Sequence, residues 1–76
     1  MKAKEYDALV KLMRGDMQSA SNRAARRVLV DGISQLAARQ EIDVSRAGVS
    51  NAVKRYADAD KLIREAYGID PDTGGR

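Results

Sequence analysis

The stretch Ile33–Arg55, which reads ISQLAARQEIDVSRAGVSNAVKR, decides the fold of this chain. A short apolar segment around Leu36 leads into Ile42-Asp43-Val44. A second helix is expected to open at Ser45, because a serine hydroxyl can accept from the free N–H groups of a first helical turn. Behind it, apolar residues recur at three- and four-residue spacing, namely Val49, Ala52, Val53 and Tyr56. The pattern predicts two helices joined by a short turn.

The opposite face of this second helix is polar, with a guanidinium near the helix start, an amide one turn later and an ammonium group after that. Such groups can reach base edges in the major groove of DNA. We therefore interpret residues 33–55 as a helix-turn-helix and residues 45–55 as its recognition helix. The expected base contacts are Arg46, Ala47, Ser50 and Asn51.

Phosphate contacts are expected around this reading face. Lys54 and Arg55 lie a turn or more beyond the helix start, which suits the DNA backbone better than the bases. Ser34 and Gln35 begin the first helix of the motif, where N–H groups often meet a phosphate. The preceding basic residues either contact phosphate or pair with nearby acids. The full expected phosphate set is Ser34, Gln35, Ser45, Lys54, Arg55, Arg26 and Arg27.

Composition and charge agree with binding to a polyanion. The 76 residues make one small domain, and its formal charge is +3. Residues 21–55 hold a net charge of +4, whereas residues 56–76 hold −2, so the basic excess is local. The chain has no Phe or Trp to fill a core. A thin, alanine-rich core favours completion by a second copy of the chain in a homodimer.

The N-terminal half predicts two further helices. The first covers residues 2–13, with Gly15 as a left-handed residue after its end and Asp16 capping the next helix. That next helix is expected to end at Asp31-Gly32. Its buried stripe is Met17, Ala20, Ala24, Val28 and Leu29, and Met13, Met17, Leu36 and Val49 are expected in the core.

The remaining boundaries follow from capping residues. Ser34 caps a short helix to about Glu41, and Gly48 inside the next helix indicates close approach to a neighbouring helix or to DNA. Beyond Arg55 the helix either continues to Tyr67 or breaks near Asp58, and the lack of Gly or Pro over 49–67 favours continuity. The prediction is an all-α domain of four to five helices over residues 1–69, stopped at Gly68, with a flexible tail or linker at 70–76.

Several kinds of chemistry have no residues to perform them. The chain has no His and no Cys, which excludes the usual zinc sites and the Ser-His and Cys-His catalytic pairs. No glycine-rich phosphate loop is present. We therefore expect a protein that is not an enzyme, needs no cofactor and takes no small-molecule substrate. No apolar run could span a bilayer, and the expected location is the bacterial cytoplasm, with the nucleoid or a plasmid.

The stretch RVLVDG (27–32) followed by SRAGVSNAVKR (45–55) resembles the TrfB/KorA family of plasmid-encoded transcriptional repressors. In that family a helix with a VLVDG-like end leads into the helix-turn-helix, and the recognition helix reads much like T-R-G-A-V-S-Q-A-V-H-R. Arg46, Val49, Ser50 and Arg55 match this run, while Ser45 replaces the Thr, Asn51 the Gln and Lys54 the His. The resemblance covers roughly residues 26–56.

The resemblance implies operator binding as a homodimer and repression of plasmid genes, with bases read by Arg46 and Asn51. The sequence departs from the pattern at Arg39, ten residues before Val49, where a small residue is usual, and at Asp43, where Gly is common in the turn. A plasmid stability or segregation protein with a similar motif fits as well. The alternative outside DNA binding is a helical protein-interaction module, which would show apolar anchors on the exposed side of residues 45–55.

Overall fold

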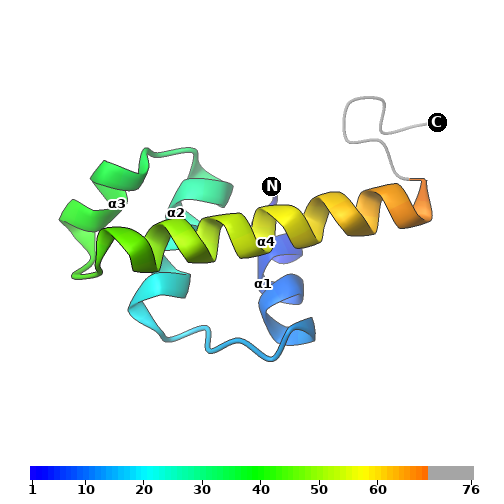
Figure 1. Ribbon diagram of the computed structural model, residues 1–76, viewed down its shortest axis with the longest axis horizontal. Coiled ribbons are helices and arrows are strands. Elements are labelled where there is room, and N and C mark those ends of the chain that lie inside the picture. The colour runs from blue at the N-terminus through cyan, green and yellow to red at the C-terminus, as the bar shows by residue number, and fades with distance from the viewer. Residues whose placement is uncertain (69–76) are drawn as a thin grey trace.

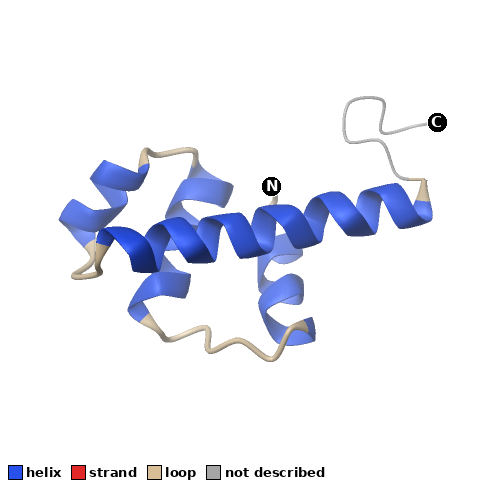
Figure 2. Ribbon diagram, in the orientation of Figure 1, coloured by secondary structure: helices blue, strands red, loops and turns tan. Residues whose placement is uncertain are grey.

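The computed structural model describes residues 1–68 as four helices joined by loops (Figures 1 and 2). The helices are α1 (Ala3–Leu12), α2 (Ala20–Asp31), α3 (Gln35–Glu41) and α4 (Arg46–Tyr67). The all-α prediction is confirmed. Ile69 and the tail expected at 70–76 lie outside the described residues. None of the described helices has the length and apolarity that crossing a membrane requires.

Serine hydroxyls begin three of the helices. Ser19, Ser34 and Ser45 have extended backbones, and their hydroxyls accept from the N–H groups of Asn22, Ala37 and Gly48 at 3.1, 3.0 and 2.9 Å. Each bond satisfies a donor that the first helical turn leaves free. Gly32 and Gly68 end α2 and α4 with φ of 76° and 69°. The expected caps at Ser34 and Ser45 and the expected ends at these two glycines are confirmed.

The connection between α1 and α2 differs from the prediction. Arg14, with φ of 58°, takes the left-handed conformation expected at Gly15. Asp16 does not cap α2. Its carboxylate accepts from the backbone N–H of Gln18 at 2.8 Å, in a local turn. Because α2 begins only at Ala20, Met17 stays in the loop and is 41% exposed, so its place in the buried stripe was wrong.

The core forms around α2, which packs against all three other helices. One cluster joins α1, α2 and α4 through Tyr6, Leu9, Val10, Ala25, Ala52 and Tyr56. A second joins α2, α3 and α4 through Ala24, Ala38 and Val49. Alanine at these positions lets the helix backbones approach closely. The expected core positions of Met13 and Leu36 were wrong, since both side chains are exposed.

The helix α4 is continuous, so the predicted continuity is confirmed and a break near Asp58 is not found. Its first half lies beside α2 and α3, and its second half passes α1 and extends beyond the other helices (Figure 1). Arg64 fastens this second half by donating to Asp60 at 2.9 Å and to Glu5 of α1 at 3.3 Å. One straight element therefore runs from the predicted reading segment to the far end of the molecule.

Candidate nucleic-acid interface

Small residues set the packing of α3 and α4. Ala38 and Val49 are fully buried in the same core cluster, and Ile42 and Val44 of the connection pack beside them. Arg39, one residue later than Ala38, is exposed. Ala38, eleven positions before Val49, thus takes the place of the small residue expected ten positions before it. Arg39 at the expected position therefore does not disturb the packing of α3 against α4.

Gly48 brings the start of α4 close to α2. A Cβ atom at this position would lie 2.9 Å from the hydroxyl oxygens of Ser21 and Ser45, which is closer than real Cβ contacts. The close approach predicted at Gly48 is therefore to a neighbouring helix. This contact fixes where the first turns of α4 sit on the domain.

The face of α4 that points away from the core is polar and exposed. Val49, Ala52 and Tyr56 are buried, as the helical spacing predicted. Every predicted contact residue on the other side is exposed, namely Arg46, Ala47, Ser50, Asn51, Lys54 and Arg55. The structure therefore places all expected base contacts together on one accessible surface, which we call the polar face of α4.

An open depression of about 370 Å³ adjoins this face at the start of α4. Its lining brings the predicted residues Gln35 and Arg46 together and adds Leu36 and Arg39, which the sequence did not place at the site. The Nε–H of Arg39 points to the carbonyl oxygen of Val44 at 3.5 Å. Two guanidinium groups and an amide, from α3 and from the first residue of α4, thus line one depression.

The cations near the polar face differ in their partners. Within residues 1–68, Arg39, Arg46 and Arg55 make no ion pair. Lys54 donates to Asp58 at 2.8 Å, and this bond raises the pKa of its ammonium group. Both side chains of that pair are well exposed, so water screens it strongly. A phosphate oxygen can therefore replace Asp58 at little cost.

Arg26 and Arg27 of α2 form ion pairs that link α2 to α1 and to α3. Arg26 pairs with Asp7 of α1 at 2.9 Å, and this bond lowers the pKa of the Asp7 carboxyl. Arg27 pairs with Glu41 of α3 at 2.9 Å and with Asp31 at 2.7 Å. Of the two roles that the sequence left open, the structure shows pairing with acids for both. It does not bring Arg26 to the polar face.

The hydroxyls of Ser34 and Ser45 are engaged as helix caps, as described above. They lie at the two helix starts, and both residues are exposed. Among the expected phosphate contacts, Lys54 and Arg55 are thus on the polar face, Gln35 is beside it, and the two serines flank it.

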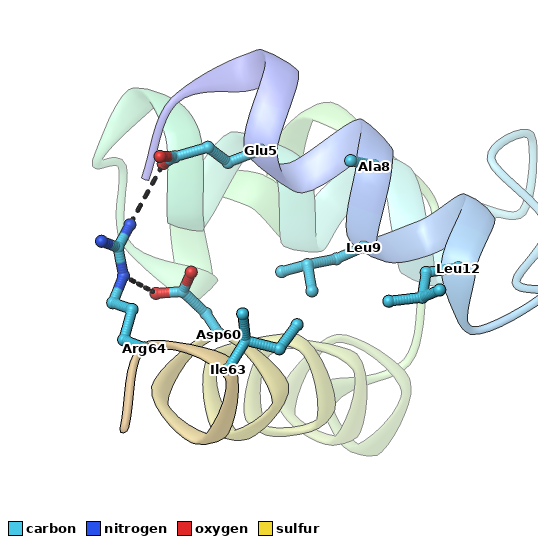
Figure 3. A pocket seen from close by; sticks show the side chains of 7 residues that line it. All are labelled: Glu5, Ala8, Leu9, Leu12, Asp60, Ile63 and Arg64. Atoms are coloured by element: carbon cyan, nitrogen blue, oxygen red, sulfur yellow. Dashed lines mark hydrogen bonds and ion pairs between the residues drawn. The ribbon is translucent and has the colours of Figure 1, made fainter. Parts of the chain in front are cut away.

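A second concave region lies at the other end of the molecule, between α1 and the second half of α4 (Figure 3). It measures about 240 Å³, with apolar walls and a charged edge where Arg64 bridges Glu5 and Asp60. Its walls are Ala8, Leu9, Leu12 and Ile63. Leu62 and Tyr67, in the same half of α4, are 66% and 77% exposed. The large exposed apolar side chains of α4 are therefore in the half of the helix away from its polar face.

Comparison with known proteins adds no relative. No family model, no curated protein and no solved structure matches the chain. Within residues 1–68, no three acidic side chains come together in a way that could hold a metal ion.

Proposed function

We propose that this protein binds double-stranded DNA in a sequence-specific manner, with α3, the connection and α4 acting as a helix-turn-helix. The observation that carries the proposal is the polar face of α4. It offers hydrogen-bonding and cationic side chains at the start of a helix whose other side is anchored in the core by Val49 and Tyr56. A helix fits the major groove of B-DNA, and the start of a recognition helix usually contacts the bases.

The side chains suit separate tasks on the duplex. The planar fork of Arg46 matches guanine O6 and N7, and the amide of Asn51 matches adenine N6 and N7. Lys54 and Arg55, further along the helix, suit phosphates. The guanidinium groups of Arg39 and Arg46 beside the depression, which form no ion pair within residues 1–68, supply attraction that depends on salt.

The biological role that we propose is transcriptional repression from a plasmid, and its support is the resemblance of residues 26–56 to the TrfB/KorA family. A DNA-binding protein for plasmid stability or segregation is the second role that this resemblance leaves open. Operator activity in a reporter strain separates the two. A repressor lowers expression from a promoter that carries its site, whereas a segregation protein changes plasmid retention without that effect.

The apolar end of the molecule supports a protein partner in addition to DNA. The groove between α1 and α4, together with exposed Leu62 and Tyr67, offers apolar surface that a second copy of the chain can cover. We propose a homodimer at this end. If the chain were only a protein-interaction module, this surface alone would be functional, and the polar face of α4 would bind no DNA.

The test is a competition titration on duplexes enriched from a random-sequence pool by the full chain. Wild type is expected to prefer an enriched duplex over random duplex by at least about a thousandfold, as specific DNA-binding proteins do. Its affinity should fall as salt rises. Asn51→Ala should lower this preference by about 1–3 kcal/mol, the contribution of one bidentate base contact. The control is Gln40→Ala, which removes another exposed amide, from α3 and outside the polar face.

Three outcomes decide the proposal. If one sequence is enriched, and the preference for it falls in Asn51→Ala but stays in Gln40→Ala, the polar face of α4 reads the bases. Binding without sequence preference reduces the protein to an electrostatic DNA binder. Absence of binding at low salt, with a normal helical circular dichroism spectrum, rejects DNA binding and leaves the interaction module.

A further inference from the structure

Leu36 is exposed in the middle of a basic, polar surface. It is 63% exposed and lines the open depression together with Gln35, Arg39 and Arg46. The apolar side of α3 is formed by Ala38, which is fully buried, with Ile33 and Ile42 packed beside it. Leu36 precedes Ala38 by two residues, or about 200° of helix rotation, so it points to the opposite side. Leu36 belongs to neither of the two core clusters.

Single exposed leucines are common on protein surfaces and need no explanation by themselves. Leu36 differs from the others by its surroundings. Among the described residues, the other large exposed apolar side chains lie in α1, in the loop after it or at the far end of α4, and they are Leu12, Met13, Met17, Leu62 and Tyr67. Leu36 alone shares a depression with the arginine that begins the polar face.

The major groove contains one apolar group in unmodified DNA, the 5-methyl group of thymine, and apolar side chains recognise it by contact. Leu36 and Arg46 line one depression, and base pairs follow each other at about 3.4 Å along a strand, so both side chains can meet base pairs of one short stretch. Arg46 is the member of this pair that matches a guanine. Leu36 is the member that matches a methyl group.

We infer that Leu36 contacts the 5-methyl group of a thymine beside the base pair that Arg46 reads, and so adds a second determinant of sequence to the site. This inference rests on the proposed function, because it needs α4 in the major groove with the exposed side of α3 beside it. It also assigns to α3 a direct part in base recognition, where the sequence predicted only phosphate contacts at Ser34 and Gln35.

The test replaces each thymine of an enriched duplex in turn by deoxyuridine, which removes the methyl group and keeps every hydrogen bond. Wild type is expected to lose about three- to fivefold in affinity at one position, the effect of exposing one methyl-sized apolar group. Leu36→Ala should bind the thymine and uracil duplexes equally well at that position. The readout is the ratio of the two dissociation constants, measured at one salt concentration.

Met17→Ala is the control, because Met17 is also an exposed apolar side chain but lies in the loop after α1, outside both surfaces. It should keep the wild-type ratio even if its overall affinity changes. A uniform loss of Leu36→Ala on every duplex would place Leu36 against the sugar-phosphate backbone and overturn the inference. So would a uracil effect that persists in Leu36→Ala, or no uracil effect at any position. If no duplex is enriched at all, the proposed function itself fails.

Discussion

The rings of Tyr6 and Tyr56 meet edge to face in the core, with centroids 5.2 Å apart and ring planes at 67°. Their hydroxyl groups have different surroundings. Tyr6 donates to the backbone carbonyl of Asn22 at 2.7 Å, and burial raises the pKa of its hydroxyl above the ordinary value. The Tyr56 hydroxyl is buried without a hydrogen-bond partner among the described residues, close to the position that a Cβ atom on Gly15 would occupy.

This difference predicts opposite effects of the same substitution. Tyr6→Phe should lower the free energy of unfolding by about 1 kcal/mol, because it breaks a buried hydrogen bond. Tyr56→Phe should leave the stability unchanged or raise it by about 1 kcal/mol, because it removes an unsatisfied buried group. Urea denaturation of the two variants, followed by circular dichroism, measures both values. Equal losses would mean that the Tyr56 hydroxyl has a partner in solution.

The contact between α2 and α4 at Gly48 gives a second prediction. Alanine is about 1 kcal/mol better than glycine inside a helix. Gly48→Ala should nevertheless lower stability by about 1 kcal/mol, because its methyl group collides with Ser21 and Ser45. In a Ser21→Ala background the loss should shrink, as expected of two residues in contact. A stabilised Gly48→Ala variant would show that α4 shifts away from α2 without cost.

The amino-acid sequence predicts much of this fold because its boundaries are local. A serine N-cap bonds only to the first turn of the helix that it begins, and a glycine C-cap bonds only to the last turn of the helix that it ends. Ser34, Ser45 and Gly32 could therefore be assigned without tertiary information. The loop after α1 could not. There Arg14 takes the left-handed conformation, and Gly15 is needed for the space that Tyr56 of α4 occupies. That requirement comes from a residue 41 positions away.

The polar face of α4 was predictable for the same reason that its buried side was, since both follow from the helical spacing of Val49, Ala52 and Tyr56. Leu36 was missed at the site because its side chain was assigned to the core. Arg39 was missed because it was considered only as a departure from the small residue that is usual there. The signal was present in the phase of α3. Ala38 and Ile42 fix its buried side, and Leu36 lies half a turn from it.

The ion pair between Asp7 and Arg26 predicts a dependence of stability on pH. The hydrogen bond from Arg26 lowers the pKa of the Asp7 carboxyl in the folded state. A carboxyl with a lowered folded pKa stabilises the fold above its unfolded pKa, and this contribution is lost as the pH falls through the folded value. Because both side chains are 38% exposed, the contribution at neutral pH should not exceed about 1 kcal/mol.

Asp7→Asn measures this contribution. Its loss of stability relative to wild type should be largest at neutral pH, shrink on acidification and be smaller at high salt. In an Arg26→Gln background the same substitution should cause little further loss, as a coupled pair requires. Thermal melts at a series of pH values test this, and a loss that is independent of pH would assign the effect to packing and not to charge.

Arg46 carries the sharpest prediction about function. It is exposed at the first position of α4, has no ion pair within residues 1–68 and lies beside Gln35 and Leu36. If it forms a bidentate pair with a guanine, Arg46→Ala should cost about 1–3 kcal/mol on an enriched duplex and much less on random duplex. Arg46→Lys should not restore the preference, because an ammonium group cannot form the fixed two-bond pair.

Arg55→Ala supplies the control for this measurement, because Arg55 is also exposed and without an ion pair in the described part of the chain, but lies later on α4. Its removal should weaken binding to enriched and random duplexes alike and lower the salt dependence by about one unit. Replacing the guanine that Arg46 reads should reproduce the loss in wild type and add nothing in Arg46→Ala. If Arg46→Ala and Arg55→Ala instead weaken both duplexes equally, Arg46 contacts the backbone, and the polar face of α4 holds the protein on DNA without reading it there.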